Sequence, residues 1–316
     1  MKQSILIEPR HSQVKEMPVP TPGEEDVLVQ MKACGVCASE LHGWQGDSHP
    51  YPRQLGHEVS GEVAAVGSHV QEFKPGMRVT GLFGRGFAEY ALTHQSLVTP
   101  IPEGIAYEHA LGEPLGCIFS GARRTHIELG DTVAVIGLGF MGLLMLQALR
   151  LRGAGQLFVI DPRPEARQAA LKLGATETLS PDMIPDHLVM TEWGKLGKGY
   201  GVNVVIEACG TQAGLTLAGE MVREHGLLSI VGFHQGGLRQ VNMEMWNWKA
   251  FDVINAHERR NDYLMDSMRR GLNFLAAGKL EMAALVTHRF GLAQIDEAFQ
   301  SLEGKPAGYL KSVVKF

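Results

Sequence analysis

A glycine-rich stretch with the spacing G-x-G-x-x-G constrains the fold of this chain more than any other feature. The glycines are Gly137, Gly139 and Gly142 in VAVIGLGFMGLL, after an apolar strand-like run at 132–136 and before an apolar helix-like run. The first allows a sharp turn, the second lets a pyrophosphate approach the backbone, and the third lets the helix pack on the strand. The context predicts a parallel α/β domain with a dinucleotide at the helix N-terminus. The alternative is the same turn without a nucleotide.

An acidic residue ends the next predicted strand, LFVID, at Asp161. An acid about 20 residues after the first glycine typically accepts hydrogen bonds from a ribose 2′-hydroxyl and repels a 2′-phosphate, which favours NAD over NADP. Arg163 and Arg167 weaken this preference, because either guanidinium could bind a phosphate. We expect the cofactor site to comprise Gly137, Gly139, Phe140, Met141, Gly142, Asp161, Arg163 and Val231.

The pattern of apolar and polar residues along the sequence changes near Cys117. The chain has 316 residues, more than one hydrophobic core usually supports, so two domains are expected. Short apolar runs broken by Gly and Pro precede Cys117 and are typical of β-structure. Strands alternating with helices follow and predict a parallel sheet, before the final GYLKSVVKF alternates like a strand again. We therefore expect a β-rich domain of residues 1–117 and 259–316 and an α/β domain of residues 118–258.

Composition argues against several kinds of partner. The formal net charge is −5 with Lys and Arg scattered, so no basic face favours nucleic acid. The apolar stretches are too short or too interrupted for a membrane span. Polar residues directly follow Met1, so we expect no signal peptide and a cytoplasmic, reducing location. Structural disulfides are rare there, which makes thiolates more plausible as metal ligands.

The segment ACGVCASELHGW contains a Cys-x-x-Cys pair, Cys34 and Cys37. The pair could be a redox dithiol, half of a zinc ribbon, or one metal ligand beside a core residue. A ribbon needs a second such pair, and the sequence has none. Other zinc-type ligands, His57, Glu58 and Glu113, follow at long, irregular distances. Such distances favour a catalytic zinc, which takes about three protein ligands and keeps one open position.

Five segments, in order, resemble the medium-chain, zinc-dependent alcohol dehydrogenases, and most of all the sorbitol and threonine dehydrogenase branch. They are CGVCASELH, GHEVSGEVAAVG, EPLGC, VAVIGLGFMG and VTHRF, and the resemblance covers essentially the whole chain. It implies a Gro-ES-like, β-rich catalytic domain with a Rossmann domain, a doubly wound parallel sheet, inserted before its C-terminal end. The expected fold class is thus α/β plus β.

The metal ligands follow from this resemblance. Cys37 corresponds to the first zinc ligand and His57 to the second. Glu58 follows that histidine and is a ligand or swings in as one. Glu113 is either a direct ligand or the residue that holds a water on the metal. Cys34 then belongs to a strand and packs in the core.

The resemblance also implies catalytic residues. Ser39 corresponds to the residue that takes the alcohol proton, and His42 to the one that passes it towards solvent. Glu40 stands where an aspartate is usual, and we expect it to steady the metal-binding histidine.

One segment departs from the family. Most relatives have a four-cysteine lobe with a structural zinc after the strand equivalent to GMRVTGLF, but here GRG leads directly to FAEYAL. The resemblance therefore implies one catalytic zinc per chain and no structural zinc. The polar residues His257, Glu258 and Arg259 fall where relatives approach the nicotinamide, which favours a hydroxyl-rich or charged substrate, although a solvated charged segment has the same composition.

These expectations combine into one activity. We expect NAD-dependent oxidation of a secondary alcohol (a polyol, sugar or cyclitol) to a ketone by a homodimer or homotetramer. Two alternatives are a dehydrogenase for a threonine-like amino alcohol or a bulky hydroxyethyl compound, and a non-catalytic NAD-binding protein.

Overall fold

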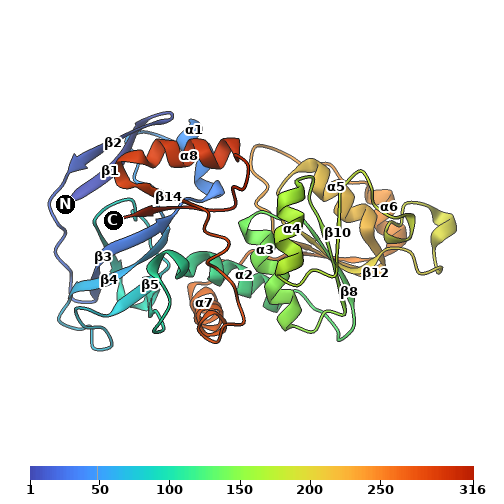
Figure 1. The fold of residues 1–316 in the computed structure, drawn as a ribbon, viewed down its shortest axis with the longest axis horizontal. Coiled ribbons are helices and arrows are strands. Elements are labelled where there is room, and N and C mark those ends of the chain that lie inside the picture. The colour runs from blue at the N-terminus through green and yellow to red at the C-terminus, as the bar shows by residue number, and fades with distance from the viewer. Residues whose placement is uncertain (48) are drawn as a thin grey trace. The chain divides into compact units, whose positions relative to one another are not determined.

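The chain forms two structural units, and one of them is built from two separate stretches of the sequence. The computed structural model describes residues 1–47 and 49–316. One unit comprises Met1–Cys117 and Arg259–Phe316, and the other comprises Ile118–Glu258. Both labelled termini therefore belong to the first unit (Figure 1).

The first unit is built on a seven-stranded sheet with the order β14-β15-β3-β4-β5-β7, in which β6 also pairs with β3. A separate antiparallel hairpin joins β1 to β2. The strands are β1 (Lys2–Glu8), β2 (His11–Glu16), β3 (Asp26–Gly35), β4 (Glu58–Val66), β5 (Arg78–Gly81), β6 (Tyr90–His94), β7 (Val98–Pro100), β14 (His288–Gly291) and β15 (Ser312–Lys315).

Four helices accompany this sheet: α1 (Leu41–Gln45), the start of α2 (Gly112–Arg124), α7 (Asn261–Ala276) and α8 (Ile295–Gly304). The apolar face of α8 closes the core, because Phe299 stacks on Trp44 with ring centroids 5.5 Å apart. Both side chains are buried. This packing ties α8 to α1, the helix that carries His42.

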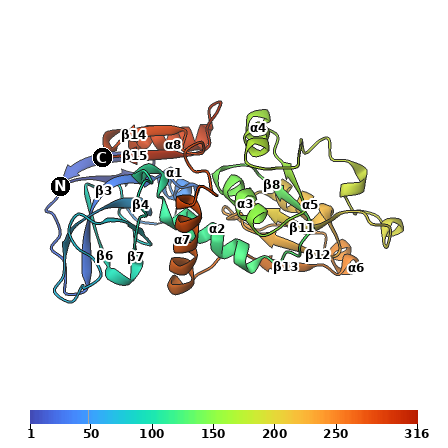
Figure 2. The ribbon, with the colours of Figure 1, turned by 60° about the horizontal axis from the view of Figure 1, so that its bottom comes forward.

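The second unit contains a six-stranded parallel sheet with the order β10-β9-β8-β11-β12-β13. The order runs outward in one direction from β8 and then in the other from β11, so right-handed crossovers place helices on both faces. Figure 2 shows the sheet with these helices. The strands are β8 (Thr132–Ile136), β9 (Gln156–Ile160), β10 (Glu177–Leu179), β11 (Val202–Glu207), β12 (Val222–Ile230) and β13 (Asp252–Asn255); the helices are α3 (Phe140–Leu151), α4 (Pro164–Lys172), α5 (Gln212–Met221) and α6 (Met243–Lys249).

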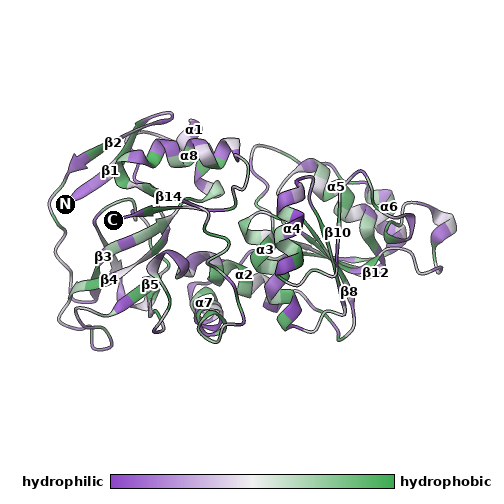
Figure 3. Ribbon diagram, viewed as in Figure 1, coloured by the Kyte–Doolittle hydropathy of each residue, from purple (hydrophilic) through white to green (hydrophobic). Residues whose placement is uncertain are grey.

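The strands at the centre of this sheet, β8 and β11, consist mostly of apolar residues, whereas α4 alternates between polar and apolar residues (Figure 3). That difference is expected, since a parallel strand is covered on both faces and a surface helix on one. The prediction of a β-rich domain combined with a doubly wound parallel sheet is confirmed. In the part of the chain that the structure describes, no helix combines the length and apolar character needed to cross a membrane.

Candidate active site

The pairing of β3 with β4 brings three zinc-type ligands together. Gly35 at the end of β3 lies opposite Glu58 at the start of β4. Cys37 follows β3 and His57 precedes β4, so both side chains lie at the same end of this pair. One ligand atom from each of Cys37, His57 and Glu58 lies within 4.8 Å of the others. A sulfur, an imidazole nitrogen and a carboxylate oxygen form a donor set that fits a zinc ion.

His57 is oriented by an acidic neighbour. Its Nδ1 atom lies 3.0 Å from Oε1 of Glu40, and the same oxygen accepts a hydrogen bond of 2.7 Å from the backbone N–H of Gly56. Burial alone lowers the pKa of His57, but its bonds to Cys37 and Glu40 raise that pKa to about 12. With Nδ1 directed at Glu40, the other ring nitrogen remains for a metal, which would displace the proton. Glu40 thus contacts His57, the residue that we expected it to orient.

Glu58 has a charged partner that the sequence did not reveal. Its side chain is buried, and the Nζ atom of Lys311 donates a hydrogen bond of 2.6 Å to its Oε1. Its Oε2 accepts no hydrogen bond from the described residues, although the same ammonium lies 2.6 Å away. A Cβ atom on Gly35 would lie only 2.0 Å from this oxygen, so only glycine fits there. Glu58 thus has a buried carboxylate oxygen that is ion-paired with Lys311 and hydrogen-bonded to no described residue.

Cys34 and Cys37 have different environments. Cys34 is fully buried on β3 among apolar core residues, as predicted. Burial raises the pKa of its thiol well above the ordinary value. Cys37 is half-buried and accepts a hydrogen bond of 3.2 Å from Oγ of Ser39. The environment of Cys34 favours a core residue over a partner in a dithiol pair.

Glu113 is the second residue of α2 and lies outside the group formed by Cys37, His57 and Glu58. Its Oε1 accepts a hydrogen bond of 3.1 Å from Sγ of Cys117, one helical turn later. Burial raises the pKa of Glu113, and the charge of Glu58 raises it further against the opposing effect of His57. Glu113 therefore interacts with the cluster electrostatically without being a member of it.

The two expected proton-transfer residues are exposed. Ser39 lies in the short 3-10 helix Ala38–Glu40, and His42 follows on α1. The Ser39 hydroxyl donates a hydrogen bond to Cys37. No hydrogen bond joins Ser39 to His42, and both residues lie in the described part of the chain.

The segment after β5 packs against the residue before His57. The backbone N–H of Gly86 donates to the carbonyl oxygen of Gly56 at 2.9 Å, and Phe87 is buried in the core. A Cβ atom on Gly86 would lie 2.4 Å from Cγ1 of Val59, so the segment approaches the sheet very closely. This direct backbone contact supports the segment that carries His57.

The predicted nucleotide loop has the geometry expected of its three glycines. Gly137 adopts φ 96°, which glycine tolerates best. A Cβ atom on Gly142 would lie 1.9 Å from the carbonyl oxygen of Gly137, whereas one on Gly139 would meet nothing within 4 Å. Gly139 thus has open space in front of it at the N-terminus of α3, and this space fits a pyrophosphate.

Asp161 is buried at the end of β9, and both of its carboxylate oxygens are bonded within the protein. Leu138 N donates to Oδ2 at 2.8 Å, and Arg163 donates to both oxygens through Nε at 2.9 Å and a terminal nitrogen at 3.0 Å. Burial raises the pKa of Asp161, but the bonds from Arg163 and Leu138 outweigh it and lower that pKa. Asp161 therefore connects the glycine loop to Arg163.

A second buried acidic residue of this unit, Glu207, was not identified from the sequence. Glu207 ends β11 with its side chain fully buried, and its backbone oxygen accepts a hydrogen bond from Val231 N at 2.8 Å. Its Oε2 lies 2.8 Å from Nε2 of His234, whose Nδ1 accepts from Nε of Arg239 at 3.1 Å. An arginine can only donate, so Nε2 carries the imidazole proton and donates to Glu207. The sequence signal that could have identified Glu207 was an acidic residue inside the apolar run VNVVIEACG.

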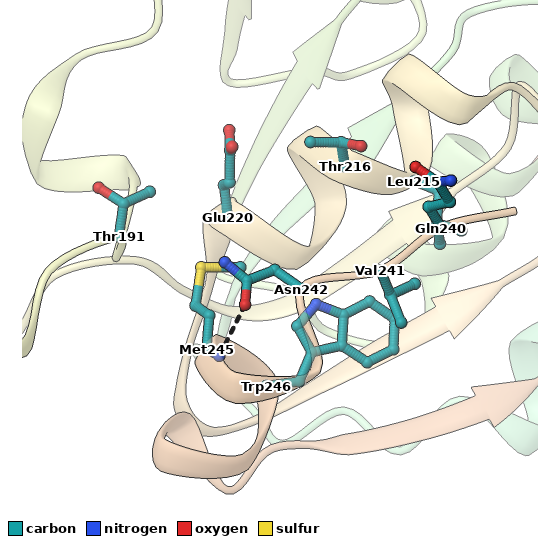
Figure 4. Close-up of a pocket in the computed structure, with 9 residues that line it drawn as sticks. All are labelled: Thr191, Leu215, Thr216, Glu220, Gln240, Val241, Asn242, Met245 and Trp246. Atoms are coloured by element: carbon teal, nitrogen blue, oxygen red, sulfur yellow. Dashed lines mark hydrogen bonds between the residues drawn. The ribbon is translucent and has the colours of Figure 1, made fainter.

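A small cavity of about 140 Å³ lies between α5 and α6 (Figure 4). Trp246, Met245 and Glu220 contribute to its wall, and Asn242 accepts a hydrogen bond from the Met245 backbone at its edge. None of the predicted cofactor or metal residues lines it.

Comparison with known proteins identifies the family. Residues 23–103 match the alcohol dehydrogenase GroES-like domain, and residues 141–265 match the zinc-binding dehydrogenase domain. The sorbitol dehydrogenase of Bacillus subtilis (strain 168) is 30% identical, over 95% of this chain and 93% of its own length. The chain belongs to the medium-chain, zinc-dependent alcohol dehydrogenase family, as the sequence motifs indicated.

Solved structures agree in fold. A zinc-binding dehydrogenase from Sinorhizobium meliloti 1021 with bound NADP superimposes with a TM-score of 0.87 and 28% identity, covering 100% of this chain and 99% of that one. The 2R,3R-butanediol dehydrogenase of Bacillus subtilis gives a TM-score of 0.84 and 25% identity with the same coverage. This chain is an oxidoreductase of the alcohol dehydrogenase type.

Proposed function

We propose that the protein transfers hydride between a secondary alcohol of the polyol, sugar or cyclitol type and NAD, with one zinc ion in each chain. The grouping of Cys37, His57 and Glu58 within 4.8 Å carries this proposal. The similarity to a sorbitol dehydrogenase supports the substrate class.

Each residue of the site has a role in this proposal. Cys37, His57 and Glu58 hold the metal, and Glu40 orients His57. A bound zinc ion would polarise the alcohol oxygen, and a bound nicotinamide would accept the hydride. Ser39 Oγ takes the alcohol proton, and the exposed His42 passes it to solvent.

The preference for NAD rests on charge. Arg163 is hydrogen-bonded to Asp161 through two side-chain nitrogens, so its positive charge is compensated and less available to a 2′-phosphate. Arg167 donates to the backbone oxygens of Asp161 and Pro162 instead. The cofactor residues of the proposal are Gly137, Gly139, Phe140, Met141, Gly142, Asp161, Arg163 and Val231.

Elemental analysis tests the metal part directly. The unsubstituted protein should contain about one zinc per chain, and Cys37→Ser should lose it. Cys209→Ser is the matched control, because this exposed cysteine lies in the other unit and should leave the zinc content unchanged. A zinc-free protein after zinc-replete purification would sink the proposal.

A substrate panel then tests the chemistry. Polyols, sugars and cyclitols are offered with NAD or NADP, beside threonine-like amino alcohols and bulky hydroxyethyl compounds. Preferential turnover of the amino alcohols would replace the proposed substrate class. Nucleotide binding without turnover of any alcohol would favour a non-catalytic protein.

We also propose that the chain forms a homodimer or homotetramer. Strand β13 is an edge of the six-stranded sheet, and its Val253 is 42% exposed. An open edge with an exposed apolar residue is a favourable place for a second copy to pair. Sedimentation of the protein and of Val253→Lys tests this, and a monomer at micromolar concentration would contradict it.

A further inference from the structure

A hydrogen bond within α2 connects Glu113 to a cysteine that has had no role so far. Sγ of Cys117 lies 3.1 Å from Oε1 of Glu113. The two residues are four positions apart on α2, so their side chains lie on one face of the helix. An ionised carboxylate has no hydrogen to give, so the thiol is the donor.

The start of α2 is held near Glu58 independently of Cys117. The backbone N–H of Gly112 donates to Oγ1 of Thr80 at 3.0 Å, and that hydroxyl donates to the carbonyl oxygen of Val59 at 2.6 Å. A Cβ atom on Gly112 would lie 2.5 Å from the same hydroxyl, so the helix start is in close contact with β5. Glu113 is thereby brought beside the residue that precedes Val59.

Despite this proximity, Glu113 is not part of the group formed by Cys37, His57 and Glu58. Its Oε1 is bonded along its own helix to Cys117. We propose that the Cys117 thiol is a positioning group that holds Glu113 out of direct metal coordination, so that Glu58 is the carboxylate ligand. This inference rests on the proposed metal site and selects between the two roles that Glu113 could have in it.

The physical reason is that the Cys117 thiol and the metal compete for the carboxylate of Glu113. A hydrogen bond to a ligand-type side chain fixes its orientation, and loss of a partner that orients a metal ligand commonly costs about 10- to 100-fold in metal affinity. A partner that holds a carboxylate away from the metal should act in the opposite direction. Without the thiol, the flexible Glu113 side chain is free to rotate towards a cation held by Cys37, His57 and Glu58. The metal would then gain an additional oxygen ligand.

Cobalt(II) binding in place of zinc tests the inference without any activity measurement. Four variants are compared with the parent: Cys117→Ala, Cys117→Ser, Glu113→Gln and the double variant Cys117→Ala/Glu113→Gln. Cys117→Ala should change the visible cobalt spectrum and bind cobalt roughly tenfold more tightly. Cys117→Ser should behave like the parent, because a hydroxyl also donates. In the Glu113→Gln background, Cys117→Ala should have no further effect, whereas a general packing defect would persist there.

Three results would overturn the inference. If Cys117→Ala and the parent share one spectrum and one affinity, the thiol does not position Glu113, while Cys37-dependent cobalt binding leaves the proposed function standing. If Cys117→Ala removes part of the sulfur-to-cobalt absorption, Cys117 is itself a ligand. If the parent binds no cobalt in a Cys37-dependent manner, the metal site and the inference fail together.

Discussion

The Nζ atom of Lys311 lies 2.6 Å from Oε1 of Glu58, and both side chains are buried. The same ammonium donates to the carbonyl oxygen of Val36 at 3.0 Å. These two bonds connect the start of β15 to the ends of β3 and β4, beside the proposed metal ligands.

Replacing Lys311 by methionine should destabilise the protein strongly. The substitution leaves the Glu58 charge buried without its partner, and breaking a buried pair in this way costs about 3–5 kcal/mol. Denaturant unfolding followed by fluorescence measures the change. Lys315→Met is the control, because Lys315 is 53% exposed and pairs with Glu108 at 3.0 Å, and ion pairs of exposed side chains contribute about 1 kcal/mol or less. Equal shifts of the midpoint in both variants would refute the argument.

Glu40→Ala should weaken zinc binding by roughly 10- to 100-fold, because it removes the acid that orients His57. Competition with a chromophoric chelator gives the affinity. Glu24→Ala removes an acid 3.7 Å from His69 on the surface and should leave zinc binding unaltered. Unchanged affinity in Glu40→Ala would show that the ring of His57 is held by its packing alone.

Asp161→Ser should raise the preference for NADP. The substitution removes the carboxylate that compensates Arg163 and leaves its guanidinium available to a 2′-phosphate. We expect the ratio of kcat/KM for NADP to that for NAD to rise by about tenfold or more, equivalent to about 1.4 kcal/mol. Asp182→Ser, at an exposed acid bonded to Ser180, is the control. A constant ratio in Asp161→Ser would place cofactor selection elsewhere.

Lys249 should make the free energy of unfolding depend on pH in the neutral to alkaline range. Its side chain is buried, and Nζ donates to the backbone oxygens of Gly219 at 2.6 Å and Glu220 at 3.1 Å. Burial lowers the pKa of Lys249 from 10.5 to about 7, against a smaller opposing effect of Glu220. The unfolded chain therefore binds more protons between these values, so this residue's contribution to stability rises with pH from about 7 to 10.5.

The matched variant is Lys249→Met, which cannot titrate. The difference in melting temperature, variant minus parent, should be larger at pH 6 than at pH 9, because the buried positive charge penalises the parent at the lower pH. Thermal unfolding at both values measures it. A difference independent of pH would mean that the ammonium keeps an ordinary pKa in the folded protein.

Features that depend on neighbouring residues in sequence were predictable. The Gly137 loop follows its strand and opens its helix as expected, because turn, strand and helix are all specified within about 20 residues. The helix α7 (Asn261–Ala276) buries residues at helical spacing, which is also a local pattern. The placement of Cys34 in the core followed from its position on an apolar strand.

Two helices with readable signals were missed. Helix α8 buries Ile295, Ala298, Phe299 and Leu302, which have helical spacing in QIDEAFQSLEG. Helix α2 begins at Gly112, and recognising it would have placed Cys117 one turn after Glu113. Lys311 could not have been found in this way, because its partner is 253 positions away and no local pattern marks the pair.

The position of β15 in the sequence implies an order of folding for the proposed metal site. Residues 313–315 on β15 pair with 33–35 on β3, and Lys311 neutralises Glu58. A ribosome that has made both ligand segments has therefore not yet made the strand that completes their sheet. The intervening residues 118–258 form a separate unit and can fold in the meantime. Until residue 311 emerges, the carboxylate of Glu58 lacks its counter-ion, so the nascent chain completes the proposed ligand cluster only after residues 118–258 have been made.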